Sequence, residues 1–236
     1  GRSSDLLTNT ATTTETGSFS TGDFYHASTT LSCGTTYYFR AYGTNSGGTG
    51  FGTILNFTTA VCTPTIETHA ATGTTASYAN LAATTTAIGG ENLSARGFAV
   101  GRSSTLSTNT ATTTESGSYG TGDFYTASTT LICNTTYYFR AYGTNSAGSG
   151  YGTILNFTTT ACAPTVETHA ATGTTGTYVN LGATTTALNG ANVTTRGFAI
   201  GRSSDLLTNT ATTTETGNFS TGDFYSASTT LRCPTT

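Results

Sequence analysis

The sequence predicts an all-β protein made of tandem β-sandwiches, and three observations lead to this fold class. The tetrapeptide Gly-Arg-Ser-Ser starts at Gly1 and returns at Gly101 and Gly201, so the chain repeats every 100 residues. Thr, whose β-branched side chain favours pleated strands over helices, replaces Lys and Glu as the dominant polar residue. Short strand-like segments alternate with turn signals about every 12 residues, and no segment shows a convincing helical period.

The chain contains one complete repeat between two partial ones. Residues 1–60 match residues 101–160 at 48 of 60 positions. Pro64 and Pro164 each follow a finished strand and mark the boundaries between repeats. The predicted domains are the C-terminal part of a first repeat (1–60), a complete sandwich (61–160) and the N-terminal part of a third repeat (161–236). A repeat of 100 residues is long enough to bury its own core.

Seven segments of the complete repeat have the composition of strands. They are residues 66–70, 76–81, 96–100, 118–119, 124–125, 137–142 and 153–158. The last two form the strongest pair, and the turn-forming residues 145–150 join them into a hairpin.

The five cysteines recur with a spacing of 29 residues. Facing residues of an antiparallel hairpin have a constant index sum, and for Cys33 and Cys62 that sum is 95, which centres on the predicted turn. We therefore expect the disulfides Cys33–Cys62 and Cys133–Cys162. Cys233 has no partner within the sequence and would need a missing or neighbouring segment to complete it.

The expected register of the hairpin conflicts slightly with the cysteine pairs. If Phe39 and Ala41 face inward together with Leu55 and Phe57, the index sum is 96 instead of 95. A bulge or a one-residue stagger near the cysteines would reconcile the two.

The disulfides imply a stable repeat in an oxidising compartment. Closing a loop of about 30 residues stabilises a fold by ~3–4 kcal/mol in the chain-entropy model. Catalytic or metal-binding cysteines would need to cluster or to have a His partner, whereas these occur once at each hairpin end. The predicted location is therefore extracellular or at the cell surface.

The last third of the repeat resembles a fibronectin type III domain. The resemblance rests on Leu131, Cys133, Thr135 and the alternating residues Tyr137, Phe139 and Ala141, followed by the turn Asn-Ser-Ala-Gly at 145–148. Residues 198–203 and the Tyr-Tyr-Phe-Arg-Ala-Tyr segment are similar to divergent fibronectin-like repeats of long bacterial surface proteins. This resemblance implies immunoglobulin-like, fibronectin type III-like sandwiches.

Composition excludes several partners. Charged residues make up only 8% of the chain, the formal net charge is −3, and every basic residue is Arg, so no basic patch exists for a nucleic acid. No apolar run approaches 18 residues and no leader starts at Gly1, so we expect neither a membrane span nor a signal peptide within this segment. Any targeting signal would lie outside it.

Polar side chains offer weak candidates for chemistry. Glu67 and His69 share a strand face, but two ligands do not make a metal site, and we interpret them as solvated residues. Asp23 and Asp123 lie in Thr-Gly-Asp-Phe-Tyr, which we expect to form a turn. No Ser or Cys stands beside a base and an orienting acid. We predict no catalytic residues, no metal and no cofactor.

An aromatic and cationic stripe is expected on one outer sheet face. Side chains alternate along a strand, so residues next to the inward Tyr37, Phe39 and Ala41 point outward. The candidate interaction face consists of Tyr38, Arg40, Tyr42, Tyr138, Arg140 and Tyr142. It could bind a glycan or a partner, or it could be ordinary cross-strand packing. Asn-x-Thr/Ser motifs permit glycosylation at Asn56, Asn92, Asn134, Asn156, Asn192 and Asn218.

These features favour a structural function. The first hypothesis is an extracellular filament, stalk or surface fibre whose repeats or subunits stack head to tail, so the partners are copies of the chain or further repeats. We expect neighbouring protein to complete both partial repeats, which would otherwise expose half a core. The alternative is an adhesion or glycan-binding module that uses the Tyr and Arg stripe. Ice binding is weaker, because the Thr runs do not alternate along one flat face.

Overall fold

All regular structure in the described part of the protein is β-strand. The computed structural model describes residues 1–6, 11–107, 110–202, 204, 206 and 211–228. Within these residues, no helix has the length and apolar character needed to cross a membrane. The prediction of an all-β fold is therefore confirmed.

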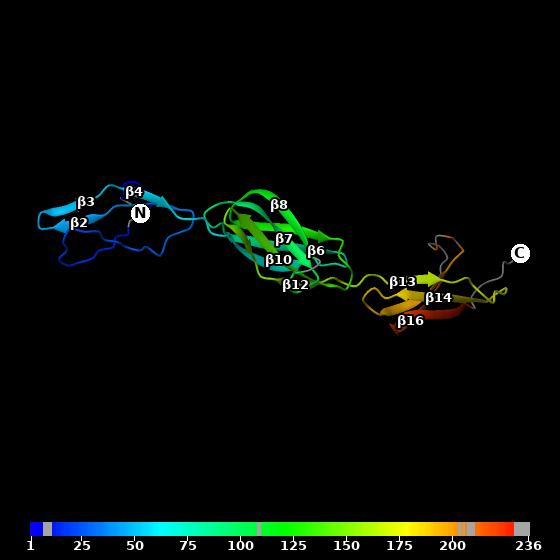
Figure 1. Ribbon diagram of the computed structural model, residues 1–236. Helices are drawn as coiled ribbons and strands as arrows, with labels where there is room; N and C mark the ends of the chain where they lie inside the picture. Colours follow the sequence, from blue (N-terminus) through cyan, green and yellow to red (C-terminus); the bar gives the residue numbers. More distant parts are fainter. Residues whose placement is uncertain (7–10, 108–109, 203, 205, 207–210, 229–236) are drawn as a thin grey trace. The chain divides into compact units, whose positions relative to one another are not determined.

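The described residues form seventeen strands, and Figure 1 labels several of them. In chain order they are β1 (Thr36–Phe39), β2 (Tyr42–Asn45), β3 (Gly48–Phe51), β4 (Leu55–Thr58), β5 (Thr65–Thr72), β6 (Tyr78–Ala87), β7 (Leu93–Gly101), β8 (Ala111–Tyr119), β9 (Gly122–Thr129), β10 (Thr136–Asn145), β11 (Gly148–Tyr151), β12 (Leu155–Thr158), β13 (Thr165–Thr168), β14 (Val179–Ala187), β15 (Val193–Ile200), β16 (Ala211–Phe219) and β17 (Gly222–Ser228).

These strands belong to two compact units. Unit 1 comprises Gly1–Ala70, Leu81–Thr126 and Tyr138–Leu155, and unit 2 comprises Ala71–Asn80, Ala127–Tyr137 and Asn156–Thr236. The units do not test the division into residues 1–60, 61–160 and 161–236, which stays a prediction.

Two sheets that form the layers of a β-sandwich lie mainly in unit 1, and the ends of some of their strands fall within the bounds of unit 2. One sheet has the strand order β11-β10-β7-β8, and the other has the order β5-β6-β9. Figure 1 shows β7, β8 and β10 side by side in the first of these layers. β7 pairs antiparallel with both β8 and β10, and the strand order is that of an immunoglobulin-like, fibronectin type III-like sandwich.

The core of unit 1 lies between these sheets. The ring of Phe98 in β7 packs 5.3 Å, centroid to centroid, from the ring of Phe124 in β9. The backbone N–H of Ala141 in β10 donates to the Thr68 hydroxyl of β5 across the layers, over 3.1 Å. Phe98 and Phe139 are at most 1% exposed, which accounts for much of the stability of the sandwich because each such burial is worth about 1.5–3 kcal/mol.

Strand β10 alternates between the core and the outer face as predicted. Its odd-numbered residues from Tyr137 to Asn145 are buried, and its even-numbered residues from Tyr138 to Thr144 are half-buried. The Tyr138–Arg140–Tyr142 stripe therefore lies on the outer face of the sheet.

Thr-rich segments form more strand than predicted. β8 runs over Ala111–Tyr119, whereas the sequence indicated a strand only at residues 118–119. β6 continues through the threonines to Ala87, and Thr85 is 1% exposed. A strand whose alternating residues are all Thr shows no apolar period, so hydrophobic patterning does not detect it.

The hairpin register differs from the expected one. Tyr37 lies opposite Phe57 and Phe39 opposite Leu55, an index sum of 94, so the expected sum of 96 for the inward residues was wrong. Pairs between β2 and β3 have a sum of 93. The C-terminal side of the hairpin therefore has one residue more than the N-terminal side at residues 52–54, between the β2–β3 and β1–β4 pairings. It has a second extra residue between the β1–β4 pairing and the cysteines. A stagger was predicted; its position and size follow from this geometry.

Unit 2 repeats the same construction with a different set of strands. Its sheets have the orders β13-β14-β17 and β15-β16. The ring of Phe198 in β15 packs 5.2 Å from that of Phe224 in β17, which matches the Phe98–Phe124 pair of unit 1. Val179, Ala183 and Val193 are buried beside them.

Candidate functional site: the stapled hairpin and its junction

Both expected disulfides are present at the open ends of the hairpins. The Cα atoms of Cys33 and Cys62 are 5.7 Å apart, and those of Cys133 and Cys162 are 5.6 Å apart. These separations lie in the usual range for disulfides. Cys233 lies outside the described residues.

A threonine with a bonded hydroxyl lies near each disulfide in the sequence, Thr159 buried and Thr59 half-buried. The hydroxyl of Thr159, which is 1% exposed, accepts the N–H of Thr135 at 2.9 Å and donates to the carbonyl of Ile132 at 2.6 Å. Thr59 makes the same two bonds, to Thr35 and Ser32. The threonine hydroxyl therefore ties the strand that enters the hairpin to the strand that leaves it.

A tyrosine that opens each hairpin fixes the approaching chain. The N–H of Ile132 donates to the hydroxyl of Tyr137 at 3.0 Å, and the N–H of Ser32 donates to that of Tyr37 at 2.8 Å. The bond to Ser32 is the main reason why the pKa of Tyr37 falls to about 8, with a further contribution from Arg2. Tyr137 is one of the residues on which the resemblance to fibronectin type III domains rests, and its hydroxyl anchors the backbone of the segment that precedes the hairpin.

The chain that leaves the first disulfide bonds at once to the following sandwich. The N–H of Cys62 donates to the carbonyl of Gly89 at 2.9 Å. The side-chain amide of Asn145, which is 5% exposed, donates to the carbonyl of Cys62 at 2.8 Å and to that of Ile88 at 3.0 Å. Both backbone polar groups of Cys62, its N–H and its carbonyl, are thus bound by residues of the complete repeat.

The second junction has the same backbone bond. The N–H of Cys162 donates to the carbonyl of Asn189 at 3.0 Å, at the position equivalent to Gly89. The side-chain amide of Asn189 also donates to the carbonyl of Ala163 at 2.7 Å. In both repeats the residue after the hairpin is therefore part of a hydrogen-bonded junction instead of a loose linker.

Glycine is required at the turn that meets the first disulfide. Gly89 and Gly90 have φ of +70° and +97°, which L-residues with a side chain rarely adopt. A Cβ on Gly90 would lie 2.6 Å from the carbonyl oxygen of Cys33, and one on Gly89 would lie 2.0 Å from that of Cys62. In the second junction Asn189 takes the position of Gly89, whereas Gly190 keeps the glycine of Gly90, so the second turn residue is the one at which both junctions lack a side chain.

Several residues of the predicted interaction face contact side chains of neighbouring strands. The guanidinium of Arg140 lies 4.1 Å from the ring centre of Tyr151, and that of Arg40 lies 4.0 Å from that of Phe51. The hydroxyl of Tyr142 bonds to Thr114 at 2.5 Å. These contacts match cross-strand packing, the second interpretation of the stripe.

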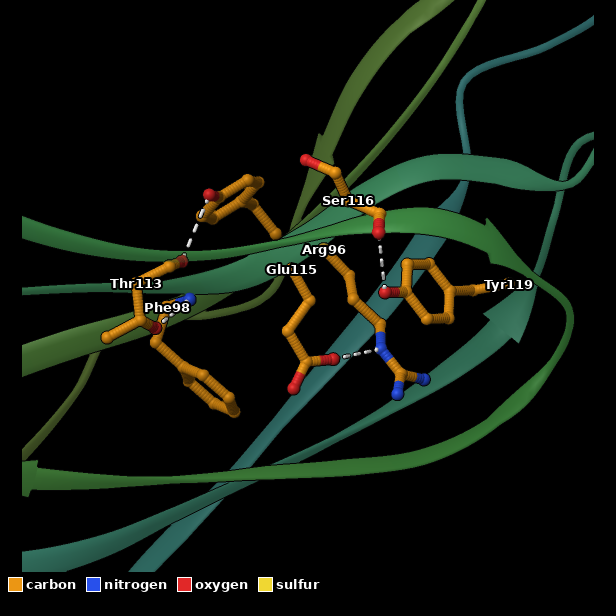
Figure 2. A network of polar contacts seen from close by, with 7 residues as sticks. Arg96, Phe98, Thr113, Glu115, Ser116 and Tyr119 are labelled. Carbon is orange, nitrogen blue, oxygen red and sulfur yellow. Dashed lines mark hydrogen bonds and ion pairs between the residues drawn. The ribbon is translucent and has the colours of Figure 1, made fainter.

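A second set of Arg–aromatic contacts was not predicted. The guanidinium of Arg96 lies 4.1 Å from the ring centre of Tyr119 and forms an ion pair with Glu115 at 2.9 Å (Figure 2). It also lies 5.0 Å from the ring centre of Phe124. Arg196 repeats this arrangement with Phe219, Phe224 and Glu215. The long side chain covers one edge of the Phe core. The signal in the sequence was the recurrence of Arg and Glu at equivalent positions.

His69 belongs to a polar cluster on the outer face of the β5-β6-β9 sheet. The Thr84 hydroxyl donates to the carboxylate of Asp123 at 2.5 Å and lies 3.0 Å from Nε2 of His69. A hydroxyl has one proton and the carboxylate takes it, so Nε2 of His69 must donate to Thr84. This histidine therefore does not withdraw a proton from the hydroxyl, as the base of a catalytic triad would.

The turn predicted at Asp123 was wrong. Asp123 lies in β9, where pairing with β6 brings its carboxylate to Thr84. In unit 2, Thr184, His169 and Asp223 repeat the cluster. Among the described residues, no three His, Cys, Asp or Glu side chains gather as a metal site would require.

Replacing Thr84 by Val is expected to raise the pKa of Asp123. The Thr84 hydrogen bond is the largest cause of the lowered pKa of this carboxyl, ahead of opposing desolvation and of smaller contributions from Tyr125 and His69. Because the folded-state pKa is lowered, the interaction stabilises the fold above the unfolded pKa of about 3.9 and is lost as the pH falls through the folded value. Carboxyl-carbon NMR titration measures the shift. Thr184→Val is the matched control and should move only Asp223; equal shifts of both carboxyls in either variant would contradict the assignment.

All six predicted glycosylation asparagines are exposed, which leaves them accessible to modification. They are Asn56, Asn92, Asn134, Asn156, Asn192 and Asn218.

Comparisons with known proteins identify no sequence family for the chain. No family model matches it, and no curated protein is significantly similar to it. Similar solved structures include the sensor domain of the anti-sigma factor RsgI4 of Pseudobacteroides cellulosolvens, with 20% identity and a TM-score of 0.36 over 44% of this chain and 100% of that one. Domains A168–A170 of titin share 15% identity, with a TM-score of 0.33 over 45% of this chain and 37% of that one.

The FN1–FN3 domains of chicken CNTN1 share 14% identity, with a TM-score of 0.34 over 86% of this chain and 67% of that one. These scores are low, so the assignment of the fold depends on the strand order and on the packed Phe residues of the chain itself. By those criteria, the protein is built from immunoglobulin-like, fibronectin type III-like β-sandwiches stapled by disulfides.

Proposed function

We propose that this chain is a structural element of an extracellular or cell-surface fibre or stalk, in which sandwiches are joined head to tail and carry tension. The observation that carries the proposal is the position of the disulfides. Each one joins the residues that enter and leave a hairpin, Cys33 to Cys62 and Cys133 to Cys162, 29 positions apart. A pull along the chain then passes through the S–S bond and bypasses the hairpin.

The junction transmits this load to the next sandwich. Cys62 and Cys162 each donate a backbone hydrogen bond to the turn of the following repeat. The side-chain amide of Asn145 also donates a hydrogen bond to the carbonyl of Cys62. A covalent staple followed directly by a bonded junction favours a load-bearing role over a flexible string of domains.

Immunogold electron microscopy of native surface material tests the proposal. Antibodies against the complete repeat should label fibres or stalks at a regular axial spacing, because every 100-residue unit presents the same epitope. Label confined to soluble secreted material, with none on elongated structures, would contradict it.

A further inference from the structure

The complete repeat carries an arginine without a counter-ion on the outer face of one sheet. Arg140 is half-buried in the outward-facing set of β10, and its guanidinium lies 4.1 Å from the ring centre of Tyr151. Among the described residues, the arginines that form ion pairs are Arg96 and Arg196, so no carboxylate neutralises Arg140. The ring of Tyr151 is 53% exposed, so an aromatic surface lies next to this uncompensated positive charge.

The opposite face of the same sandwich carries carboxylates. In β5, Ile66 and Thr68 are buried, so the alternating Glu67 points away from the core. Its carboxylate forms no ion pair with any residue that the structure describes. Asp123 of β9 lies on the same outer face, because its hydrogen-bond partner Thr84 belongs to the outward-facing set of β6.

Strand pairing in the third repeat places these acidic groups in one row across the sheet. Thr184 of β14 lies opposite Glu167 of β13 on one side and opposite Asp223 of β17 on the other. Residues that lie directly opposite each other share a face of the sheet, so a carboxylate stands at each end of the row. The complete repeat has the same residue types at the equivalent positions, so both repeats present an acidic face.

A tyrosine ring is held in place on each acidic face. Tyr125 is 65% exposed, and its hydroxyl donates to the carboxylate of Asp123 at 3.3 Å. Tyr225 is 66% exposed and makes the same bond to Asp223, also at 3.3 Å. Its ring lies against Gly182 of the neighbouring strand, where an added Cβ would meet the ring at 3.2 Å. The acidic face thus combines carboxylates with a positioned aromatic ring, and both attract an arginine side chain.

We propose that the face around Arg140 of one copy of this chain packs against the face around Glu67 of a second copy, so that sandwiches of neighbouring chains adhere side by side. The two faces are complementary in charge, and each contributes an exposed ring, Tyr151 on one and Tyr125 on the other. Because the faces lie on opposite sides of one sandwich, the contact is heterologous and can continue from copy to copy. This inference rests on the proposed function, because it states how fibres built from this chain associate laterally.

The charged groups of the contact recur with the repeat. Arg40 is equivalent to Arg140, and Glu167 is equivalent to Glu67. A single ion pair at an exposed site is weak and sensitive to salt. Chains that lie side by side can make the contact once in each repeat, and linked contacts raise the overall affinity without any new kind of interaction. We therefore expect weak, salt-dependent association of the 236-residue chain.

Sedimentation velocity of the 236-residue chain, at low salt and over a range of concentrations, tests the side-by-side contact. The wild type should associate as its concentration rises. The variant Glu67→Arg/Glu167→Arg should associate at least about 10-fold more weakly, because like charges then face each other. The matched control is Glu15→Arg/Glu91→Arg, which changes the net charge by the same amount at two exposed residues outside the acidic face. It should associate like the wild type.

Exchanging the charges between the two faces provides a second measurement. Adding Arg40→Glu/Arg140→Glu to the variant Glu67→Arg/Glu167→Arg returns the net charge to that of the wild type and restores the attraction. This charge-swapped chain should therefore regain association. Salt near 1 M, at which the Debye length is about 3 Å, should weaken the association of both chains. A misfolded variant could not regain the contact, so recovery separates loss of the contact from loss of the fold.

Three results would overturn the contact. They are a wild-type chain that stays monomeric, a Glu67→Arg/Glu167→Arg variant that associates like the wild type, and a charge-swapped chain that is folded by circular dichroism but does not associate. Regularly labelled native fibres together with any of these results would leave the structural function standing and refute only the lateral contact. Association with the expected charge effects, but no label on elongated structures, would instead contradict the proposed function.

Discussion

Reduction of the disulfide between Cys133 and Cys162 is expected to lengthen the fully stretched chain by about 100 Å. The bond spans 29 positions, and each extended residue contributes about 3.3–3.6 Å. While the bond is intact, the hairpin of β10, β11 and β12 cannot be drawn out, because tension passes through the two sulfur atoms. Single-molecule stretching of the chain with and without a reductant should give about twice this difference in contour length, because the reductant also opens the equal loop of Cys33–Cys62.

The double variant Cys133→Ser/Cys162→Ser is the control for this experiment. It should show the longer contour length without a reductant, and it should lose ~3–4 kcal/mol in the free energy of unfolding, the chain-entropy value for a loop of this size. The Cys33–Cys62 staple of the same molecule remains and provides an internal reference. An unchanged contour length after complete reduction would show that the hairpin is not shielded by the bond.

Replacing Phe139 by Ala is expected to cost about 3–5 kcal/mol in the free energy of unfolding of the complete sandwich, because the ring is 0% exposed and its removal leaves a cavity. Phe39→Ala is the matched control: it removes the same residue from the same Tyr-Tyr-Phe-Arg-Ala-Tyr context, but its ring is 48% exposed. The control should cost less than about 1.5 kcal/mol. Hydrogen exchange followed by mass spectrometry measures local stability in each hairpin, and equal losses would contradict the difference in packing.

The sequence predicted the features that depend on spacing and alternation. The repeat placed Cys33 and Cys62 at the open end of one hairpin, and the alternation of β10 followed from its apolar pattern. Both are local relations within a hairpin of about 30 residues. No similar signal indicated the register of that hairpin, because nothing in Gly52, Thr53 and Ile54 marks the one residue that is added between the two pairings.

Contacts between distant strands were the least predictable. The bond between Thr84 and Asp123 spans 39 residues and exists only because β6 pairs with β9. The bond from Asn145 to Cys62 spans 83 residues. An Asn in a turn and an Asp after a Gly both have strong local preferences, so sequence patterns assign them to turns. Pairing of β9 with β6 in the same sheet overrides that assignment for Asp123.

The sequence by itself determined the repeat, the β composition and the cysteine spacing, but only the tertiary structure decided which residues become strands. Residues 11–19 and 211–219 are identical at 8 of 9 positions. In the described residues, 211–219 form β16, which pairs with β15, whereas 11–19 form no strand. A strand needs hydrogen-bonding partners along its edge, and residues 1–60 contain no segment equivalent to most of β7 or β15. Local propensity is the same in both copies, so the partner strand supplies the free energy that makes one of them a strand.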